Sequence, residues 1–301
     1  MKVLCAVDGS EFSHWAVEGL GALGGPRPKT VVLLHVVDTG TIIPPRATAQ
    51  PQLKQSLAEA DRAGNALVAR LTQTATTALG QAATGPGTKV QTQVIRGPVA
   101  QTILAQAKRR KVDLLILGSR GLSDIRGFLL GSVSRRAVTM AACPVLVVKR
   151  RVTDLQRVLL AVDGSGHSKA AAEFLCADFL PQSTHLTVLS VAAPMVTELA
   201  RKVLSPDELE RLTKPAVDQA HKLVAAFREM FLKEGYAVAT AVEVGHPSQT
   251  IVQQAERLRA DLVVVGSRGL TGIDRYYLGS VSESVLKYAP CSVLVVRGGR
   301  G

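Results

Sequence analysis

Two segments of the chain carry glycines and serines in the same order and at the same spacing. Gly118-Ser119-Arg120-Gly121 is followed, after nine residues, by Gly131-Ser132-Val133-Ser134, and the pattern recurs as Gly266-Ser267-Arg268-Gly269 and Gly279-Ser280-Val281-Ser282. A glycine lets the backbone approach a ligand closely because it has no Cβ. The start of a helix offers free amides to an anion, and serine hydroxyls add donors. The spacing therefore predicts a phosphate-binding loop, present twice.

An aspartate precedes a Gly-Ser pair early in each repeat, at Asp8 and Asp163. A carboxylate would repel phosphate, but it can accept hydrogen bonds from ribose hydroxyls or from an adenine amine. The alternative is a local turn, in which the acid accepts from the backbone of the following Gly-Ser. From the residues alone, both readings stay open.

Other chemistries have little support in the sequence. The Lys-Ser/Thr ending of a P-loop, the HExxH metal motif and the GxSxG nucleophile motif are all absent. His35, at the end of a predicted strand, is interpreted as structural rather than as a base. Asp124 and Asp274, inside the two glycine loops, are the candidate Mg²⁺ ligands. Four cysteines lie singly among apolar residues, so they are expected to be reduced and buried.

The glycine pattern belongs to a larger duplication. Val3–Ser10 matches Val158–Ser165, and Cys143–Lys149 matches Cys291–Arg297. Within each copy, short runs of Val, Leu and Ile alternate with helical patterns, which is typical of a doubly wound parallel sheet with helices on both faces. Helices are predicted to begin near Ser13, Gln52, Val99 and Ser132. The predicted strands are Lys2–Val7, Thr30–Val36, Lys89–Ile95, Asp113–Leu117 and Val145–Lys149 in the first copy, and Arg157–Val162, His185–Val191, Ala237–Val244, Asp261–Val265 and Val293–Arg297 in the second.

Composition and charge set the remaining limits. The 301 residues suffice for two domains, joined by the short polar segment 150–156. No apolar run approaches the roughly 20 residues of a membrane-spanning helix, and the N-terminus is expected to form a strand, so a cytoplasmic protein is expected. The net charge of +12 attracts phosphate-bearing partners. Its densest run, Lys108-Arg109-Arg110-Lys111, is interpreted as a solvated helix end, with a polyanion contact as the alternative.

Together, the Ala-Val-Asp-Gly-Ser start, the Gly-x2-Gly-x9-Gly-Ser loop and the Cys-Pro-Val-Leu-Val-Val ending resemble the universal stress protein family. The resemblance covers essentially the whole chain, as family domains at 1–150 and 156–298. It implies an α/β fold of two tandem five-stranded parallel sheets with strand order 3-2-1-4-5. This fold is Rossmann-like and similar to the adenine nucleotide alpha hydrolases.

Family members with this glycine loop bind ATP, so the resemblance implies two ATP sites of similar affinity per chain. The ATP is expected to bind together with Mg²⁺. AMP and ADP are alternative ligands, because the loop binds phosphate without specifying the number of phosphate groups. The backbone of Val36 or Val191 would hold the adenine edge. The implied first site comprises Asp8, Val36, Gly118, Arg120, Gly121, Gly131, Ser132, Val133 and Ser134. The implied second site comprises Asp163, Val191, Gly266, Arg268, Gly269, Gly279, Ser280, Val281 and Ser282.

The function expected from these features is a nucleotide-dependent stress-response regulator rather than an enzyme. Slow ATPase or nucleotide-dependent transferase activity is the first alternative, and a polyanion-binding scaffold is the second. Nucleic acid is not the expected partner, and no protein partner can be named. Family domains pair through their last strands, so Val145–Lys149 and Val293–Arg297 would pair within one chain as a pseudo-dimer, with further homo-oligomers left open.

Overall fold

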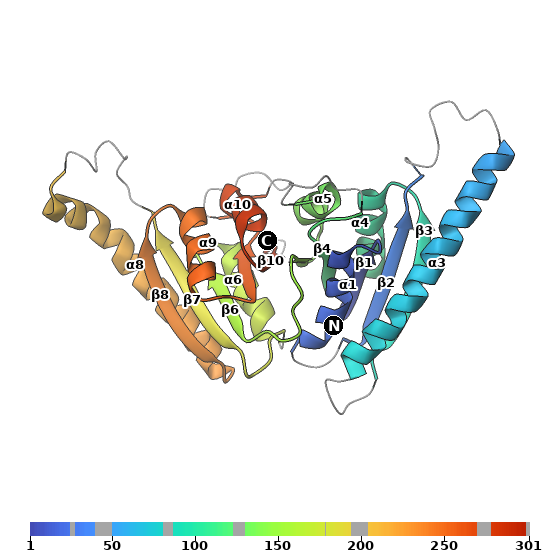
Figure 1. Ribbon diagram of the computed structural model, residues 1–301. Helices are drawn as coiled ribbons and strands as arrows, with labels where there is room; N and C mark the ends of the chain where they lie inside the picture. The colour runs from blue at the N-terminus through green and yellow to red at the C-terminus, as the bar shows by residue number, and fades with distance from the viewer. Residues whose placement is uncertain are drawn as a thin grey trace. The chain divides into compact units, whose positions relative to one another are not determined.

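The computed structural model describes residues 1–24, 28–39, 50–80, 87–122, 130–177, 179–193, 204–269 and 278–298. The chain divides into two compact units, Met1–Asp154 and Leu155–Gly301 (Figure 1). Each unit repeats the same alternation of strands and helices. No helix in the described ranges is long and apolar enough to cross a bilayer.

The first unit contains a parallel sheet in the order β3-β2-β1-β4-β5, as the family resemblance implied. Its strands are β1 (Lys2–Val7), β2 (Thr30–Val37), β3 (Lys89–Arg96), β4 (Leu114–Gly118) and β5 (Val145–Val148). Its helical elements are α1 (Glu11–Glu18), the short 3-10 helix η1 (Gly19–Ala22), α3 (Gln50–Gly80), α4 (Val99–Arg110) and α5 (Ser132–Met140).

The second unit repeats this arrangement with the order β8-β7-β6-β9-β10, again parallel. Its strands are β6 (Arg157–Ala161), β7 (His185–Ala192), β8 (Ala237–Val244), β9 (Leu262–Gly266) and β10 (Ser292–Val296). Its helices are α6 (Gly166–Cys176), α8 (Pro206–Lys233), α9 (Pro247–Arg257) and α10 (Ser280–Tyr288).

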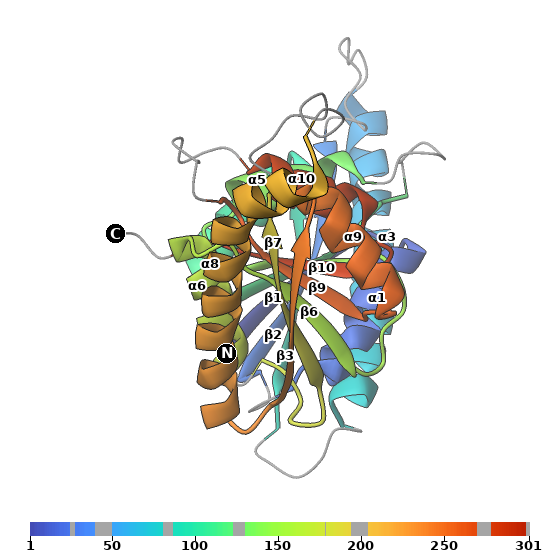
Figure 2. The ribbon, with the colours of Figure 1, turned by 90° about the vertical axis from the view of Figure 1, so that its left-hand side faces the viewer.

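Helices cover both faces of each sheet. In the first unit α1 packs beside α3, and α4 packs beside α5. In the second unit, Figure 2 shows α6 and α8 on one side of the strands and α9 on the other. Every residue of β4 and β9 is buried, which explains why these strands are almost purely aliphatic rather than alternating.

Two strands begin one residue later than predicted, for the same reason in both units. Asp113 and Asp261 were expected to be the first residues of β4 and β9. Instead, the Asp113 carboxylate accepts a hydrogen bond from the Lys2 backbone N–H at 2.6 Å, and Asp261 accepts from the Arg157 N–H at 2.9 Å. Each aspartate thus caps the neighbouring strand, and its own strand extends to the glycine that opens the loop.

Candidate functional site

A cavity of about 680 Å³ lies at the carboxyl ends of the strands in the first unit. The strand order reverses there, because β1 has β2 on one side and β4 on the other. In open α/β sheets such a reversal opens a crevice for a ligand. All residues of the predicted first site line this cavity: Asp8, Val36, Gly118, Arg120, Gly121, Gly131, Ser132, Val133 and Ser134.

The glycine loop joins the end of β4 to the start of α5. The Gly131 N–H donates to the Ser119 carbonyl at 2.7 Å, so the two ends of the loop meet beside the cavity. The corresponding bond in the second unit, from Gly279 N–H to the Ser267 carbonyl, measures 2.9 Å. Residues 123–129 and 270–277 lie outside the described ranges, and with them the candidate Mg²⁺ ligands Asp124 and Asp274.

Gly118 and Gly266 have a packing role that the sequence analysis did not foresee. A Cβ on Gly118 would lie 2.6 Å from the Cβ of Phe12, and one on Gly266 would lie 2.8 Å from the carbonyl carbon of His167. These distances are shorter than real Cβ contacts. The two glycines therefore let the first turns of α1 and α6 approach the sheet.

The serines of the second motif divide into two kinds. Ser132 and Ser280 are exposed at the starts of α5 and α10. Ser134 and Ser282 are each only 4% exposed, and each hydroxyl donates to the carbonyl of Gly118 or Gly266 at 2.6 Å. The sequence analysis expected the Ser134 and Ser282 hydroxyls to donate to phosphate oxygens. Instead, each hydroxyl joins the start of its helix to the end of the preceding strand.

The start of α5 keeps its amides available to the cavity. Gly131 occupies the N-cap position in an extended conformation, and it has no side chain that could accept from the first-turn N–H groups. The first N–H groups of a helix have no partner within the helix, and the dipole makes this end attractive to anions. Gly279 caps α10 in the same way.

Asp8 forms the local turn that the sequence left as an alternative. One carboxylate oxygen accepts from the Ser10 N–H at 2.9 Å, and the other accepts from the Leu122 N–H at 3.0 Å. The second bond ties the turn after β1 to the glycine loop. Asp163 accepts from the Ser165 N–H at 3.0 Å. A Cβ on Gly269 would approach the other oxygen of Asp163 to 2.8 Å, so that glycine is required by the aspartate.

The two repeats differ beside the arginine of the loop. In the first, the Arg120 guanidinium lies over the Phe12 ring, 4.6 Å from its centroid, a cation–π contact. In the second, His167 replaces the phenylalanine, and its Nδ1 accepts from the Gly298 N–H at 2.7 Å and lies 3.1 Å from the Ser267 Oγ.

The imidazole of His167 is held neutral by its surroundings. Burial lowers the pKa of His167 below its ordinary value of 6.5, and the positive charges of Arg268 and Arg297 lower it further, against the opposing effect of Asp163. An Nδ1 that accepts from a backbone N–H cannot also carry a proton, which agrees with this direction.

His35 has the structural position expected for it. Its Nδ1 lies 2.9 Å from the Val7 carbonyl, which joins the ends of β1 and β2. Gly64 of α3 lies against the other side of the ring, where a Cβ would be 2.7 Å from His35 Cδ2. The histidine therefore spaces α3 from the strand ends, and Val36 follows it in the cavity wall.

Helix α3 forms a wall of the cavity that the sequence analysis missed. The lining residues are Ala60, Ala63, Gly64, Leu67 and Arg70. Their spacing of three and four residues marks one face of a helix, and small residues on it could have suggested a close approach. Nothing in the glycine pattern pointed to this helix, because it lies between β2 and β3 in the chain.

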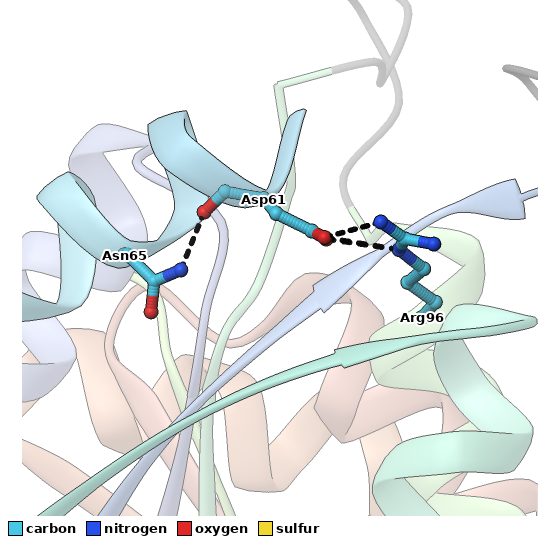
Figure 3. Close-up of polar contacts among 3 residues, drawn as sticks. All are labelled: Asp61, Asn65 and Arg96. Atoms are coloured by element: carbon cyan, nitrogen blue, oxygen red, sulfur yellow. Dashed lines mark hydrogen bonds and ion pairs between the residues drawn. The ribbon is translucent and has the colours of Figure 1, made fainter. Parts of the chain in front are cut away.

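An ion pair holds α3 to the end of β3. The Arg96 Nε donates to both carboxylate oxygens of Asp61 at 3.1 Å, and the Arg96 Nη2 also pairs with this carboxylate (Figure 3). The Arg96 guanidinium lowers the pKa of the Asp61 carboxyl below its ordinary 3.8. In the next turn of the helix, the Asn65 amide donates to the Asp61 carbonyl at 2.8 Å (Figure 3).

The described ranges contain four cysteines, no disulfide and no cluster of metal-ligand residues. None of the four cysteines forms a disulfide; Cys5 and Cys291 are buried as expected, whereas Cys143 and Cys176 are only half-buried. Burial raises the pKa of Cys5 to about 12 and that of Cys176 to about 11, so both stay protonated near neutral pH. Groups of three or more His, Cys, Asp or Glu placed to hold a metal are absent from these ranges as well.

The model of the universal stress protein family matches residues 1–149 and again 155–297. The chain belongs to the universal stress protein family. A universal stress protein of Mycobacterium tuberculosis is 27% identical over 317 residues, covering 99% of this chain and 95% of the relative. Membership as a tandem protein supports a role in the stress response.

Solved structures that match nearly the whole chain share the fold. A universal stress protein from Archaeoglobus fulgidus has a TM-score of 0.69 at 22% identity, covering 99% of this chain and 98% of its own. A functionally unknown protein from Pseudomonas aeruginosa has a TM-score of 0.59 at 18% identity, covering 99% and 92%. Both likenesses concern the tandem α/β architecture alone.

Proposed function

We propose that this universal stress protein is an ATP-binding regulator of the stress response, with one adenine-nucleotide site in each repeat. The bound nucleotide stabilises one conformation of the glycine loops, and a protein partner recognises that conformation. AMP and ADP are alternative occupants of the same sites.

The observation that carries the proposal is the cavity of about 680 Å³ at the strand ends of the first unit. Its volume falls within the roughly 300–1,000 Å³ of small-molecule sites. Residues from both glycine motifs, far apart in the chain from Asp8 and Val36, line this one space. A phosphate-binding loop needs such convergence on a ligand-sized hollow.

The phosphates would lie at the start of α5. The amides that follow Gly131 have no side-chain acceptor at the N-cap, and the exposed Ser132 hydroxyl adds a donor beside them. Arg120, also in the cavity wall, adds positive charge. Ser134 acts indirectly, because its hydroxyl proton holds the strand end that carries Gly118.

The nucleoside would lie between β1 and β2. Each oxygen of the Asp8 carboxylate accepts one backbone N–H and retains a lone pair for a ribose hydroxyl. The two backbone bonds also disperse its negative charge, which reduces its repulsion of the phosphates. The backbone of Val36, beside His35, would hold the adenine edge, and the apolar face of α3 would cover the base.

The second site would use the equivalent residues of the second unit. Asp163 makes the same turn as Asp8, Ser282 the same strand-end bond as Ser134, and Gly279 the same uncapped helix start as Gly131. These repeated contacts support an occupied second site. Its other members would be Val191, Gly266, Arg268, Gly269, Ser280 and Val281.

We also propose that the two repeats form a pseudo-dimer through β5 and β10, without excluding further self-association. Each strand stands last in the order of its own sheet, where an edge would present unpaired N–H and C=O groups. Pairing two such edges within one chain would satisfy both, as the family resemblance implies.

The proposal is tested by isothermal titration calorimetry of the full chain with ATP and with AMP, in the presence of Mg²⁺. The recovered nucleotide is then identified by chromatography. We expect two sites per chain and intact ATP. Recovery of ADP would indicate an ATPase, and absence of both binding heat and co-purified nucleotide would contradict the proposal.

Matched variants show which of the two loops is responsible for each binding site detected by calorimetry. Gly131→Val and Gly279→Val each place a branched side chain at a helix start; at Gly279 even a Cβ would lie 3.3 Å from the Arg268 Cα. Each variant should lose one of the two sites, and the double variant should lose both. Circular dichroism verifies folding. Two sites retained in the folded double variant would mean that the nucleotide binds elsewhere.

A further inference from the structure

We propose that Arg70 of α3 contacts the phosphate chain in the first repeat, so that this site distinguishes nucleotides by their number of phosphates and the second site does so less. The ligand class is a nucleoside di- or triphosphate. The inference rests on the proposed function and deepens it, because it makes two similar loops unequal. Arg70 lies outside both glycine motifs, more than forty residues before the first of them.

The position of Arg70 follows from the packing of α3 over the turn after β1. The Leu67 Cδ1 lies 3.4 Å from the place of a Cβ on Gly9, so this part of α3 lies directly against the Asp8-Gly9 turn. Arg70 follows three residues later on the same helical face and also lines the cavity. Arg70 also borders a neighbouring groove, but helical side chains lean toward the helix N-terminus, and this favours the direction of Leu67 and the cavity.

The Asp8-Gly9 turn, which would hold the ribose, lies next to the glycine loop that would hold the phosphates. The Leu122 N–H donates to the Asp8 carboxylate at 3.0 Å, and the Ser10 Oγ donates to the Arg120 carbonyl at 3.3 Å. Both bonds join this turn to the glycine loop. By contrast, Gly64, nearly two turns before Arg70 on α3, contacts His35 beside the proposed adenine edge. Along α3, Arg70 is therefore displaced from the nucleoside toward the phosphates.

Among the described residues of the cavity wall, Arg70 is a cation in addition to Arg120, which the proposed function already uses. The charged residues of the wall are Asp8, Asp38, Arg70 and Arg120. Arg120 lies over the Phe12 ring, and the Asp8 carboxylate accepts two backbone N–H groups. Arg70 is exposed, and no hydrogen bond or ion pair engages its side chain within the described part of the chain. A guanidinium without another partner can donate two parallel hydrogen bonds to phosphate oxygens, in bidentate geometry.

The second repeat provides a natural comparison. Leu223 of α8 occupies the place of Leu67, with its Cδ1 3.6 Å from a Cβ on Gly164. The register of the two helices is the same, since Val224 is buried as Val68 is, and Phe227 as Leu71 is. This register aligns Arg70 with Ala226, which is exposed. The second repeat thus lacks the cation while keeping the helix that would carry it.

The test measures how the affinity depends on the number of phosphates. The full chain is titrated at one fixed, low salt concentration with ATP, AMP and inorganic tripolyphosphate, for wild type and Arg70→Ala. We expect Arg70→Ala to lower the affinity for ATP and for tripolyphosphate at one of the two sites by about tenfold, which is the effect of losing one charge-assisted contact. The affinity for AMP should change by less than about threefold.

Three matched variants control the interpretation. Arg70→Lys keeps the charge and should retain part of the ATP preference. Gln73→Ala alters the same exposed helix one turn further on, where Gln73 lines a neighbouring groove but not the cavity, and should change nothing. Ala226→Arg should raise the affinity of the other site for ATP relative to its affinity for AMP.

The outcomes separate this inference from the proposed function. Equal losses of ATP and AMP in Arg70→Ala, or no loss of either, would overturn the role of Arg70 while nucleotide binding stands. If wild type binds neither ATP nor AMP, the proposed function fails. In that case, tripolyphosphate binding that weakens in Arg70→Ala would still support Arg70 as a phosphate contact, and its absence would overturn both.

Discussion

At the scale of single residues, the polar groups of the site mostly support one another. The Ser134 hydroxyl is buried against the Gly118 carbonyl, and the Asp8 carboxylate accepts the N–H groups of Ser10 and Leu122. A buried hydroxyl needs such a partner, because leaving it unpaired costs about 1–3 kcal/mol. The backbone amides and glycine positions are thereby held in place before any ligand arrives.

The residue that most clearly distinguishes the repeats is His167, which stands where the first repeat has Phe12. Its acceptor Nδ1 holds the Gly298 N–H, next to the end of β10, and lies beside Ser267 at the start of the glycine loop. Protonation at Nδ1 would oppose the Gly298 N–H and add a positive charge near Arg268 and Arg297. We therefore expect the stability of this repeat to depend on pH.

The expected pH dependence has a definite sign. The pKa of His167 is lower in the folded chain than its ordinary 6.5, so the unfolded chain binds the proton more readily. Stability contributed by neutral His167 is complete above pH 6.5 and decreases as the pH falls toward the lower folded value. His167→Phe should remove this dependence.

The measurement is the difference in melting temperature between wild type and His167→Phe at pH 7.5 and at pH 5.5. Taking the difference cancels the other histidines. Between pH 7.5 and pH 5.5, the melting temperature of the wild type should decrease more than that of the variant. Parallel profiles for the two proteins would contradict the assigned role.

At the scale of elements, α3 completes a site whose recognisable motifs lie elsewhere in the chain. Asp61 and Arg96 hold this helix to β3, while Gly64 and His35 set its distance from the strand ends. Exposed ion pairs contribute little to global stability. Their effect here should instead be on the position of the cavity wall.

Asp61→Asn should therefore weaken nucleotide binding at the first site by about twofold, with little change in melting temperature, because an exposed pair is screened by solvent. Raising the salt concentration should shrink the difference between variant and wild type. The measurement is calorimetric titration at low and high salt, with the second site as an internal control. A large drop in melting temperature would show that the pair stabilises the fold instead.

At the scale of the whole molecule, the duplication gives each unit its own sheet and core. β5 and β10 end their respective orders, and both are buried and, apart from Ser292, aliphatic. An aliphatic strand left as an unpaired edge is a site for association. The proposed pseudo-dimer therefore predicts how a separated repeat should behave.

A chain ending at Asp154 should form a homodimer, because β5 would find a second copy of itself in place of β10. Size-exclusion chromatography with light scattering measures this, with the full chain as reference. A half-chain that is folded by circular dichroism and stays monomeric across a range of concentrations would contradict the predicted pairing.

The sequence by itself determined the repeat, the strands and the glycine loops. Aliphatic runs such as Leu114–Leu117 must be buried on both faces, and this demands a parallel sheet covered by helices. The spacing from Gly118 to Gly131 then places a loop and a helix start at one edge of the sheet. These features depend on local composition, so they can be read along the chain.

Only the tertiary structure decided what surrounds that loop. The small face of α3, the Asp61–Arg96 pair and the contact of Leu67 with the Asp8-Gly9 turn join residues distant in the chain. The same holds for the contact between His167 and Gly298. Such contacts depend on how helices pack on the sheet, and helix periodicity specifies a buried face without naming the residues it will meet.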